Sequence, residues 1–250
     1  MKTQNTETTT TTTGTSDPAP APAPAPKTPK HRGLLNKAQL AEISHANTVY
    51  GVASDPAVFA SLQDDLILTP AFMTQLGQDL AGMSQYTGDA SEATLDAQDD
   101  TNNETTAEAE LLAKVHYIQS KAKMKYPADH PARAEYGIGD KLQGNRPLLE
   151  ATAGNIFNKL KTDTLPKIVV QHSTDLDSSL KAYQKTKVDQ KTGKGDAMTL
   201  RQKLAARVDS LAARRRQLQH GADGEYPYTN PANAGMRAKF DLPPNQPLAQ

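Results

Sequence analysis

Two stretches of this chain, 119–148 and 219–248, repeat one another without a gap at a spacing of 100 residues. Eleven of the 30 aligned positions are identical, whereas ordinary residue usage would give about two by chance. A match of this length predicts an internal duplication, in which two related units bury each other's apolar faces. We take these residues as the repeated tail: Tyr126, Pro131, Leu142, Asn145 and Pro147 in the first copy, and Tyr226, Pro231, Leu242, Asn245 and Pro247 in the second.

The first copy of the whole unit, residues 33–148, has start signals for two helices. Asp55-Pro56 and Thr69-Pro70 each place a capping residue before a proline at the first helical position. The apolar residues after each signal, among them Leu66 after the first, follow the spacing of one helix face. The sequence therefore predicts a first helix over 55–67 and a second helix that starts at this Thr-Pro pair.

Two further helices are expected in this part of the chain. The third helix is expected to begin within 90–106, after an acidic stretch at 96–104 that we expect to be a mobile loop. Another helix, over about 36–53, is expected to precede the unit. The apolar stripe of the third helix consists of Leu111, Leu112, Val115 and Ile118.

The second copy is predicted to contain the same three helices, over 148–161, from 169 onward, and from Asp196 to Gly221. Asp196 is a capping residue, and Gly221 stands where a helix would stop. The stretch TGKGD at 192–196 then forms the turn between the second and third helices. The apolar stripe of the third helix consists of Leu200, Leu204, Val208, Leu211 and Leu218.

These patterns predict an all-α protein, because no segment alternates apolar and polar residues for long enough to form a strand. Each unit alone would leave an apolar stripe in water, so we expect residues 33–148 and 149–250 to form one antiparallel helical bundle. The tail recurs after the second unit, where it links nothing further in the sequence. We therefore expect both tails to end in an extended segment and to strap across the bundle with Leu142 and Leu242 buried. In the alternative, the two tails form a paired binding site.

Residues 1–32 differ from the rest of the chain in composition. They contain a threonine run and the alternating stretch DPAPAPAPAPKTP, which favours an extended polyproline II conformation over helix. Because this segment has no apolar face to bury, it is predicted to be a disordered spacer. A glycosylated stalk is the alternative.

Cysteine is absent from the chain, which excludes disulfides, thiol nucleophiles and cysteine-based zinc sites. No apolar run approaches the roughly 18 residues of a membrane helix. The start of the chain also lacks the apolar segment of a secretory signal. We therefore expect a cytoplasmic protein that does not insert into membranes.

No motif in the sequence predicts a catalytic residue, a metal site or a cofactor. The TGKGD stretch lacks the glycine spacing and the Ser or Thr of a phosphate loop. The acidic stretch 96–104 lacks the central Gly and the final Glu of an EF-hand. The six histidines form no zinc-binding pair on one helix, and His172, on the apolar stripe of a predicted helix, is expected to be a hydrogen-bonded core residue. The chain is therefore expected to be non-enzymatic and to hold neither metal nor cofactor.

Charge is distributed unevenly along a chain whose formal net charge is zero. Residues 1–110 contain 5 Lys or Arg and 15 Asp or Glu, whereas residues 111–250 contain 23 and 13. Such asymmetry favours contact between oppositely charged surfaces, within one molecule or between molecules. The most concentrated basic feature is a candidate face on the helix 200–218, formed by Arg201, Arg207, Arg214, Arg215 and Arg216.

We therefore expect a structural, scaffold or protein-binding role, with another protein or a second copy of this chain as the partner. The alternative is a nucleic-acid-associated protein that uses the Arg-rich helix, although this helix lacks the interleaved aromatic residues of a single-strand binder. A bundle enzyme or ligand carrier with a site between the two units is a weaker alternative.

Overall fold

The computed structural model describes residues 34–64 and 66–249, and residues 34–250 form one compact unit. The spacer predicted for residues 1–32 lies outside the described residues. The described part of the chain is helical and contains no β-strand. Its elements are α1 (Lys37–Ala53), α2 (Pro56–Leu62), α3 (Pro70–Lys125), α4 (Ala132–Glu135), α5 (Arg146–Lys159), α6 (Val170–Glu225), the 3-10 turn η1 (Pro231–Asn233) and α7 (Ala234–Lys239).

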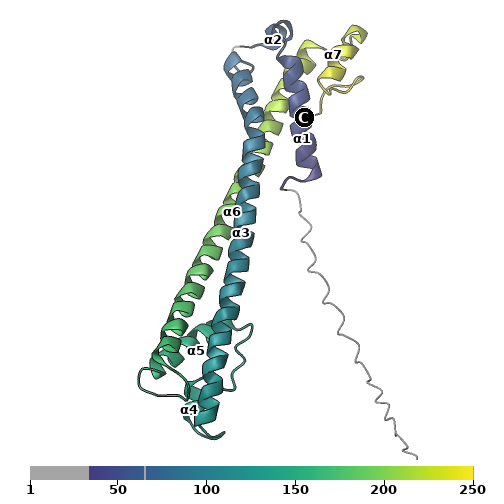
Figure 1. Cartoon of the computed structure of the whole chain (residues 1–250). Coiled ribbons are helices and arrows are strands. Elements are labelled where there is room, and N and C mark those ends of the chain that lie inside the picture. Colours follow the sequence, from purple (N-terminus) through teal and green to yellow (C-terminus); the bar gives the residue numbers. More distant parts are fainter. Residues whose placement is uncertain (1–33, 65, 250) are drawn as a thin grey trace, which may run out of the picture. The chain divides into compact units, whose positions relative to one another are not determined.

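Two long helices, α3 and α6, dominate this unit (Figure 1). Each has 56 residues, which corresponds to about 84 Å of helix. The acidic stretch 96–104 and the TGKGD stretch both lie inside these helices, as do Asp196 and Gly221. The prediction of a second and a third helix joined by a loop is therefore wrong in both copies, because the two helices are one.

A seven-residue repeat of buried side chains explains why the long helices are continuous. On α3, every seventh residue from Leu76 to Ile118 is buried. Such spacing keeps one face of a helix against a partner helix along its whole length. The buried row on α3 consists of Leu76, Met83, Ala90, Ala97, Glu104, Leu111 and Ile118. The matching row on α6 includes Leu176, Tyr183, Ala197, Leu204, Leu211 and Leu218.

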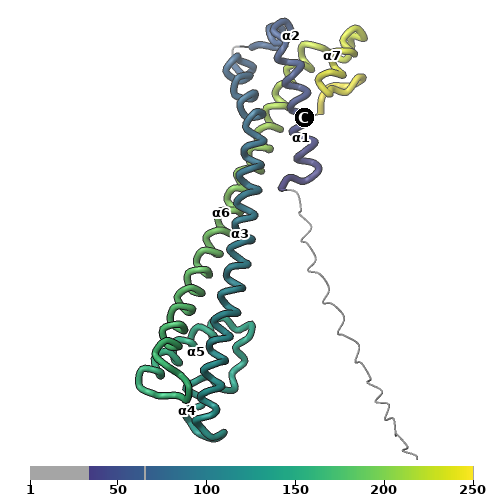
Figure 2. The backbone as a smooth tube through the Cα atoms, in the orientation of Figure 1, coloured from purple at the N-terminus to yellow at the C-terminus, as the bar shows by residue number. Residues whose placement is uncertain are grey.

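The two long helices pack side by side and antiparallel (Figure 2). Asp79 near the start of α3 pairs with Arg214 near the end of α6, with 2.6 Å between Oδ2 and Nη1. Lys114 in the last third of α3 donates to the Ser179 hydroxyl near the start of α6. At each end of the pair, the start of one long helix therefore lies beside the end of the other.

The centre of the pair is packed with small and polar residues. Thr87, Thr94 and Thr101 follow one another at intervals of seven, and each hydroxyl donates to the carbonyl oxygen four residues earlier, at 2.7–2.8 Å. Gly193 of α6 lies close to Ala97, because a Cβ atom there would stand 3.5 Å from the Ala97 Cα atom. The helices therefore approach closely in a region that has little apolar surface.

Two separate apolar cores lie on either side of this centre. The core at the α1 end contains α1, Leu62, Leu68, the start of α3, the end of α6 and Phe240. The core at the α5 end contains α5, Tyr136, Leu165, the end of α3 and the start of α6. Figure 1 shows the short helices gathered at these two ends, α1, α2 and α7 at one and α4 and α5 at the other.

The predicted helix starts are confirmed by the capping contacts. The Asp55 carboxylate accepts from the Ala57 amide at 2.8 Å, and the Thr69 hydroxyl accepts from the Phe72 amide at 3.2 Å. The prediction of a helix over 55–67 is too long, because α2 ends at Leu62. Leu66 was expected on its apolar face but is 91% exposed.

Candidate functional site

The two tails meet their long helices through the same buried glutamine contact. Gln119 on α3 donates through Nε2 to the carbonyl oxygen of Tyr136 at 2.9 Å. Gln219 on α6, 100 residues later, donates to the carbonyl oxygen of Phe240 at 2.8 Å. Both glutamines are buried. Each tail is therefore fixed to its long helix at an equivalent position.

An arginine closes each tail back onto the end of its long helix. Arg133 donates through Nε to the carbonyl oxygen of Tyr126 at 3.1 Å. Arg237 donates through Nη1 to the carbonyl oxygen of Tyr226 at 2.7 Å. Tyr126 and Tyr226 are the residues that follow α3 and α6. The contact is the same at both ends, although the two arginines are 104 rather than 100 residues apart.

The turn after each arginine has the same backbone geometry. Gly137 and Asp241 both adopt the left-handed conformation, with φ angles of 60° and 56°. The next residues, Ile138 and Leu242, donate from their amides to the carbonyl oxygens of Arg133 and Arg237 at 3.1 and 2.9 Å. The ungapped alignment therefore fails within the tail. The second tail contains four more residues there, about one helical turn.

The remaining predicted tail residues occupy different settings at the two ends. Leu142 and Leu242 are both buried, but by the geometry above Leu242 corresponds to Ile138. The tail was expected to end extended, yet Asn145 caps α5, with Oδ1 3.3 Å from the Leu148 amide, and Pro147 lies in its first turn. Pro131 and Pro231 precede or begin the short tail helices, whereas Asn245 and Pro247 lie in non-helical chain.

Arg237 anchors the C-terminal tail from a buried position. Its side chain is 1% exposed and pairs with Asp223, with 2.6 Å between Nη1 and Oδ1. It also donates to the carbonyl oxygens of Pro243 and Gln246 at 2.8–2.9 Å. Burial alone would raise the pKa of Asp223, but hydrogen bonds from the Leu248 amide and from Arg237 outweigh it and lower this pKa.

Asp163 has the corresponding anchoring role at the α5 end. The Tyr126 and Tyr136 hydroxyls donate to its Oδ2 atom at 2.5 and 2.7 Å, and Lys125 forms an ion pair with Oδ1. Burial alone would raise the pKa of Asp163, but these three hydrogen bonds outweigh it and hold the pKa at about 2. The same burial and contact raise the pKa of Tyr136. These contacts join α3, the tail and the loop after α5.

Most of the candidate basic face on α6 is engaged within the unit. Arg214 pairs with Asp79, and Arg215 forms a two-pronged ion pair with Glu42 of α1. Arg207 lies over the Tyr86 ring, 3.6 Å from its centroid, and Arg201 donates to the Thr94 hydroxyl at 3.0 Å. Arg216 is exposed, and it has no ion-pair partner among the described residues.

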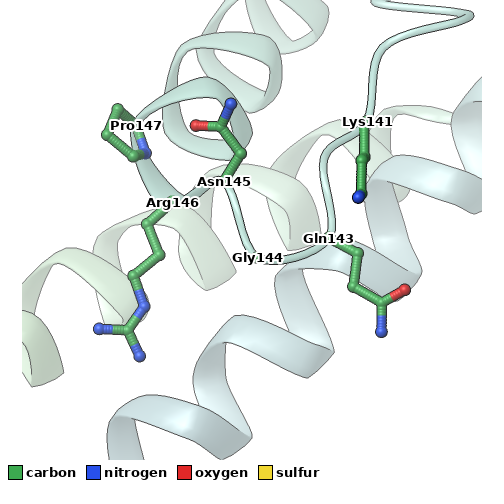
Figure 3. A pocket seen from close by; sticks show the side chains of 6 residues that line it. All are labelled: Lys141, Gln143, Gly144, Asn145, Arg146 and Pro147. Carbon is green, nitrogen blue, oxygen red and sulfur yellow. The ribbon is translucent and has the colours of Figure 1, made fainter.

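A hollow of about 630 Å³ lies along the loop before α5 (Figure 3). Lys141, Gln143 and Arg146 extend from this loop on one side, whereas Asn145 points the other way. Arg146 is already held by two carboxylates of α3, Glu104 and Glu108, each at 2.9 Å. The hollow therefore offers a bound substrate little beyond Lys141 and amide groups.

The buried phenol of Tyr183 lies near the cluster of Glu104, Glu108 and Arg146. Burial, followed in importance by the nearby Glu108 carboxylate, raises the pKa of Tyr183 to about 12. The Tyr183 hydroxyl and one oxygen of Glu104 have no hydrogen-bond partner within the described residues. A neutral phenol of this kind is neither a nucleophile nor a base at neutral pH, so the cluster suggests no reaction.

Within residues 34–64 and 66–249, no group of three or more histidine, aspartate or glutamate side chains could hold a metal ion. The helices of the same residues include none that is both long and apolar enough to cross a membrane. His172, expected on an apolar stripe, accepts from the Val169 amide at 3.2 Å and stacks on Tyr117.

The comparisons with known proteins give no relative: no protein-family model matches the chain, and no curated protein or solved structure is significantly similar to it. Its role therefore has to be inferred from its own residues.

Proposed function

We propose that this chain is a non-enzymatic scaffold protein whose long helix pair holds two related ends at a fixed separation. The observation that carries the proposal is the shared geometry of the two tails. Both ends have the buried glutamine, the arginine closure and the left-handed turn at equivalent positions. Two similar surfaces separated by a long spacer suit a protein that bridges two partners.

Internal duplication of the described unit is part of this proposal. Both long helices have 56 residues and begin and end 100 residues apart, so the spacing of the sequence repeat extends over their full length. Eight buried positions of α3 are also buried in α6 exactly one repeat later, which is difficult to reconcile with unrelated helices. The α3 positions are Leu76, Met83, Ala97, Glu104, Leu111, Ile118, Gln119 and Ala122.

The centre of the pair supports the role of a spacer. Two helices that pack over their whole length hold each other straight, whereas a single exposed helix of this length would bend and fray. The centre has few apolar groups of its own, and both apolar cores lie at the ends. Stability is therefore concentrated where the ends must keep their shape.

We assign partner binding to the turns that directly follow the two long helices, residues 127–130 and 227–230, and call them the tail turns. Each turn begins directly after a long helix, and its first hydrogen bond has the same length at both ends, 3.1 Å from His130 or Asn230 to the preceding proline carbonyl. Ala128 and Tyr228 are exposed at equivalent positions of the two turns. A partner that recognises one turn would meet a similar turn at the opposite end.

The test is to capture partners from lysate with the full chain, with and without nuclease, and then to titrate the purified partner calorimetrically. We expect a protein that remains after nuclease treatment and that binds with two partners per chain. Ala128→Arg and Tyr228→Arg each obstruct one turn, so each is expected to reduce the stoichiometry to one.

Two results would overturn the proposal. Retention that disappears with nuclease or at modest salt would favour the nucleic-acid alternative and the exposed Arg216. A small molecule that stays with the chain in native mass spectrometry, with no protein partner, would favour the ligand-carrier alternative.

A further inference from the structure

Two hollows on the helix pair are lined by residues of α3 and α6 alone. The first, of about 290 Å³, is lined by Tyr117 and Ile118 of α3 and by His172 of α6, among others; we call it the Tyr117 hollow. The second, of about 350 Å³, is lined by Asp96 of α3 and Asp196 of α6, among others; we call it the Asp96 hollow.

The two hollows lie on the same face of the pair. Tyr117 follows Asp96 by 21 residues on α3, and Gly193 of the Asp96 hollow follows His172 by 21 residues on α6. Because 21 is three repeats of seven, these residues occupy equivalent positions around each helix. The hollows are therefore in line along one face, about 31 Å apart.

The Tyr117 hollow is apolar inside and cationic at its edge. Ile118 forms a buried floor, and the Tyr117 ring, 41% exposed, stacks on His172 with 5.3 Å between ring centroids. The ammonium group of Lys121 lies 4.9 Å from the centroid of the same ring. Lys114 and one carboxylate, Asp175, also line the hollow, so together with Lys121 they give it a formal charge of +1.

The Asp96 hollow is acidic. Four of its lining residues are aspartates, and two of them, Asp96 and Asp196, are exposed. Residues 89–110 of α3 contain 8 Asp or Glu and no Lys or Arg, whereas residues 180–201 of α6, which lie opposite, contain 6 Lys or Arg and 2 Asp. The face thus carries a net negative charge at the Asp96 hollow and a smaller positive charge at the Tyr117 hollow.

We infer that this face binds a second copy of the chain, with the α5 end of each molecule over the acidic centre of the other. In this dimer the two copies lie antiparallel, so the Tyr117 hollow of each copy lies over the Asp96 hollow of the other. The same contact therefore forms twice about a two-fold axis, as in most homodimers. The complementary charges on one face are what select a second copy as the occupant.

This inference goes beyond the proposed scaffold role and is independent of it, because it concerns the sides of the helix pair rather than its ends. A dimer of this kind would carry four tail turns instead of two. The association is electrostatic in part, so we expect it to weaken as salt is raised.

Charge exchange between two variants tests the inference. One variant carries Lys121→Glu beside the Tyr117 hollow, and the other carries Asp96→Lys and Asp196→Lys in the Asp96 hollow. All three side chains lie on the surface or partly so. Sedimentation equilibrium of the full-length wild type, of each variant and of their equimolar mixture gives the dissociation constant of each dimer.

We expect the wild type to dimerise and each variant alone to dimerise at least about tenfold more weakly, because like charges then face each other. The mixture is expected to recover the wild-type affinity, since both contacts of the mixed dimer again join opposite charges. As a control, Asp99→Lys with Lys191→Glu reverses one charge of each sign at other positions of the repeat and should leave the dissociation constant unchanged.

A wild type that remains monomeric at all concentrations would overturn the inference. So would a mixture that is no tighter than the separate variants, or a control pair that weakens the dimer as much as the test variants do. Circular dichroism of each variant shows whether its helices are intact, so a loss of association through unfolding is recognised directly.

Discussion

At the scale of single residues, Arg237 and Asp163 hold the two tails by different means. Arg237 is a buried cation that satisfies one carboxylate and several carbonyl oxygens. Asp163 is a carboxylate that receives three donors. The ungapped repeat includes neither residue among its identities, because Arg237 corresponds to Arg133 at an offset of 104 rather than 100 residues and Asp163 lies outside the repeated stretches.

Replacing Arg237 is expected to be more damaging than replacing its counterpart Arg133. Arg237→Ala leaves the Asp223 carboxylate without its ion-pair partner in a partly buried position, a change that lowers the free energy of unfolding by about 3–5 kcal/mol. Arg133→Ala removes one hydrogen bond to the Tyr126 carbonyl oxygen, which corresponds to about 1 kcal/mol. Urea unfolding followed by circular dichroism measures both. Equal losses would contradict the anchoring role of Arg237.

The low pKa of Asp163 predicts how the free energy of unfolding changes in acid. Its pKa of about 2 lies below the ordinary value of 3.8, so its contribution is complete above about pH 4 and is lost as the pH falls towards 2. Asp163→Asn is expected to be less stable than the wild type at neutral pH, with a difference that narrows near pH 2. The measurement is the urea midpoint at several pH values, with Asp129→Asn as an exposed control. A difference that stays constant with pH would contradict the assignment.

At the scale of elements, the sequence predicts where helices begin better than where they continue. The starts of α1, α2 and α3 follow from Asn36, Asp55 and Thr69, whose side chains cap the first turn. These are local contacts, and the residue types that make them are visible in the sequence. The start of α5 at Asn145 and Arg146 was missed by two residues, because the tail was expected to be extended there.

The break expected inside each long helix is wrong for a different reason. Gly193, Gly195 and the acidic stretch 96–104 are poor helix formers, and they were taken as a turn and a loop. The packing of α3 against α6 outweighs these local preferences, with Ala97 and Ala197 both buried at the centre. The seven-residue spacing of Leu76, Met83, Ala90 and Ala97 is the sequence signal that would have predicted a continuous helix.

The glycines of α6 give a direct test of this continuity. At Gly195 an added Cβ would meet nothing within 4 Å, so Gly195→Ala is expected to raise the free energy of unfolding by up to about 1 kcal/mol through helix propensity. At Gly221 the added Cβ would overlap the buried Leu68 side chain, so Gly221→Ala is expected to lower it by about 1–3 kcal/mol. Thermal unfolding of both variants provides the comparison. A destabilising Gly195→Ala would indicate a turn in place of helix.

At the scale of the described unit, two cores separated by a polar centre should respond independently. Leu111 lies in the core at the α5 end and Leu211, one repeat later, in the core at the α1 end. Truncation of a buried leucine to alanine typically removes about 2–5 kcal/mol of stability. Leu111→Ala is therefore expected to increase hydrogen exchange in α4 and α5 while leaving α1 and α7 protected, and Leu211→Ala should do the reverse.

Exchange that increases over the whole unit in either leucine variant would contradict this independence. It would mean that the helix pair transmits the loss from one end to the other, and that the unit unfolds as a single cooperative structure.

The most direct test of the account is the length of α6 between Gln184 and Gln217. Because the chain contains no cysteine, two introduced cysteines carry spin labels at these positions alone. A continuous helix places the two backbone positions about 50 Å apart, and we expect one narrow distance distribution near this value in the full-length protein. A helix that folds back at residues 192–196 would place them about 22 Å apart. That shorter distance would contradict the long helix pair, and with it the proposal of two ends held at a fixed separation.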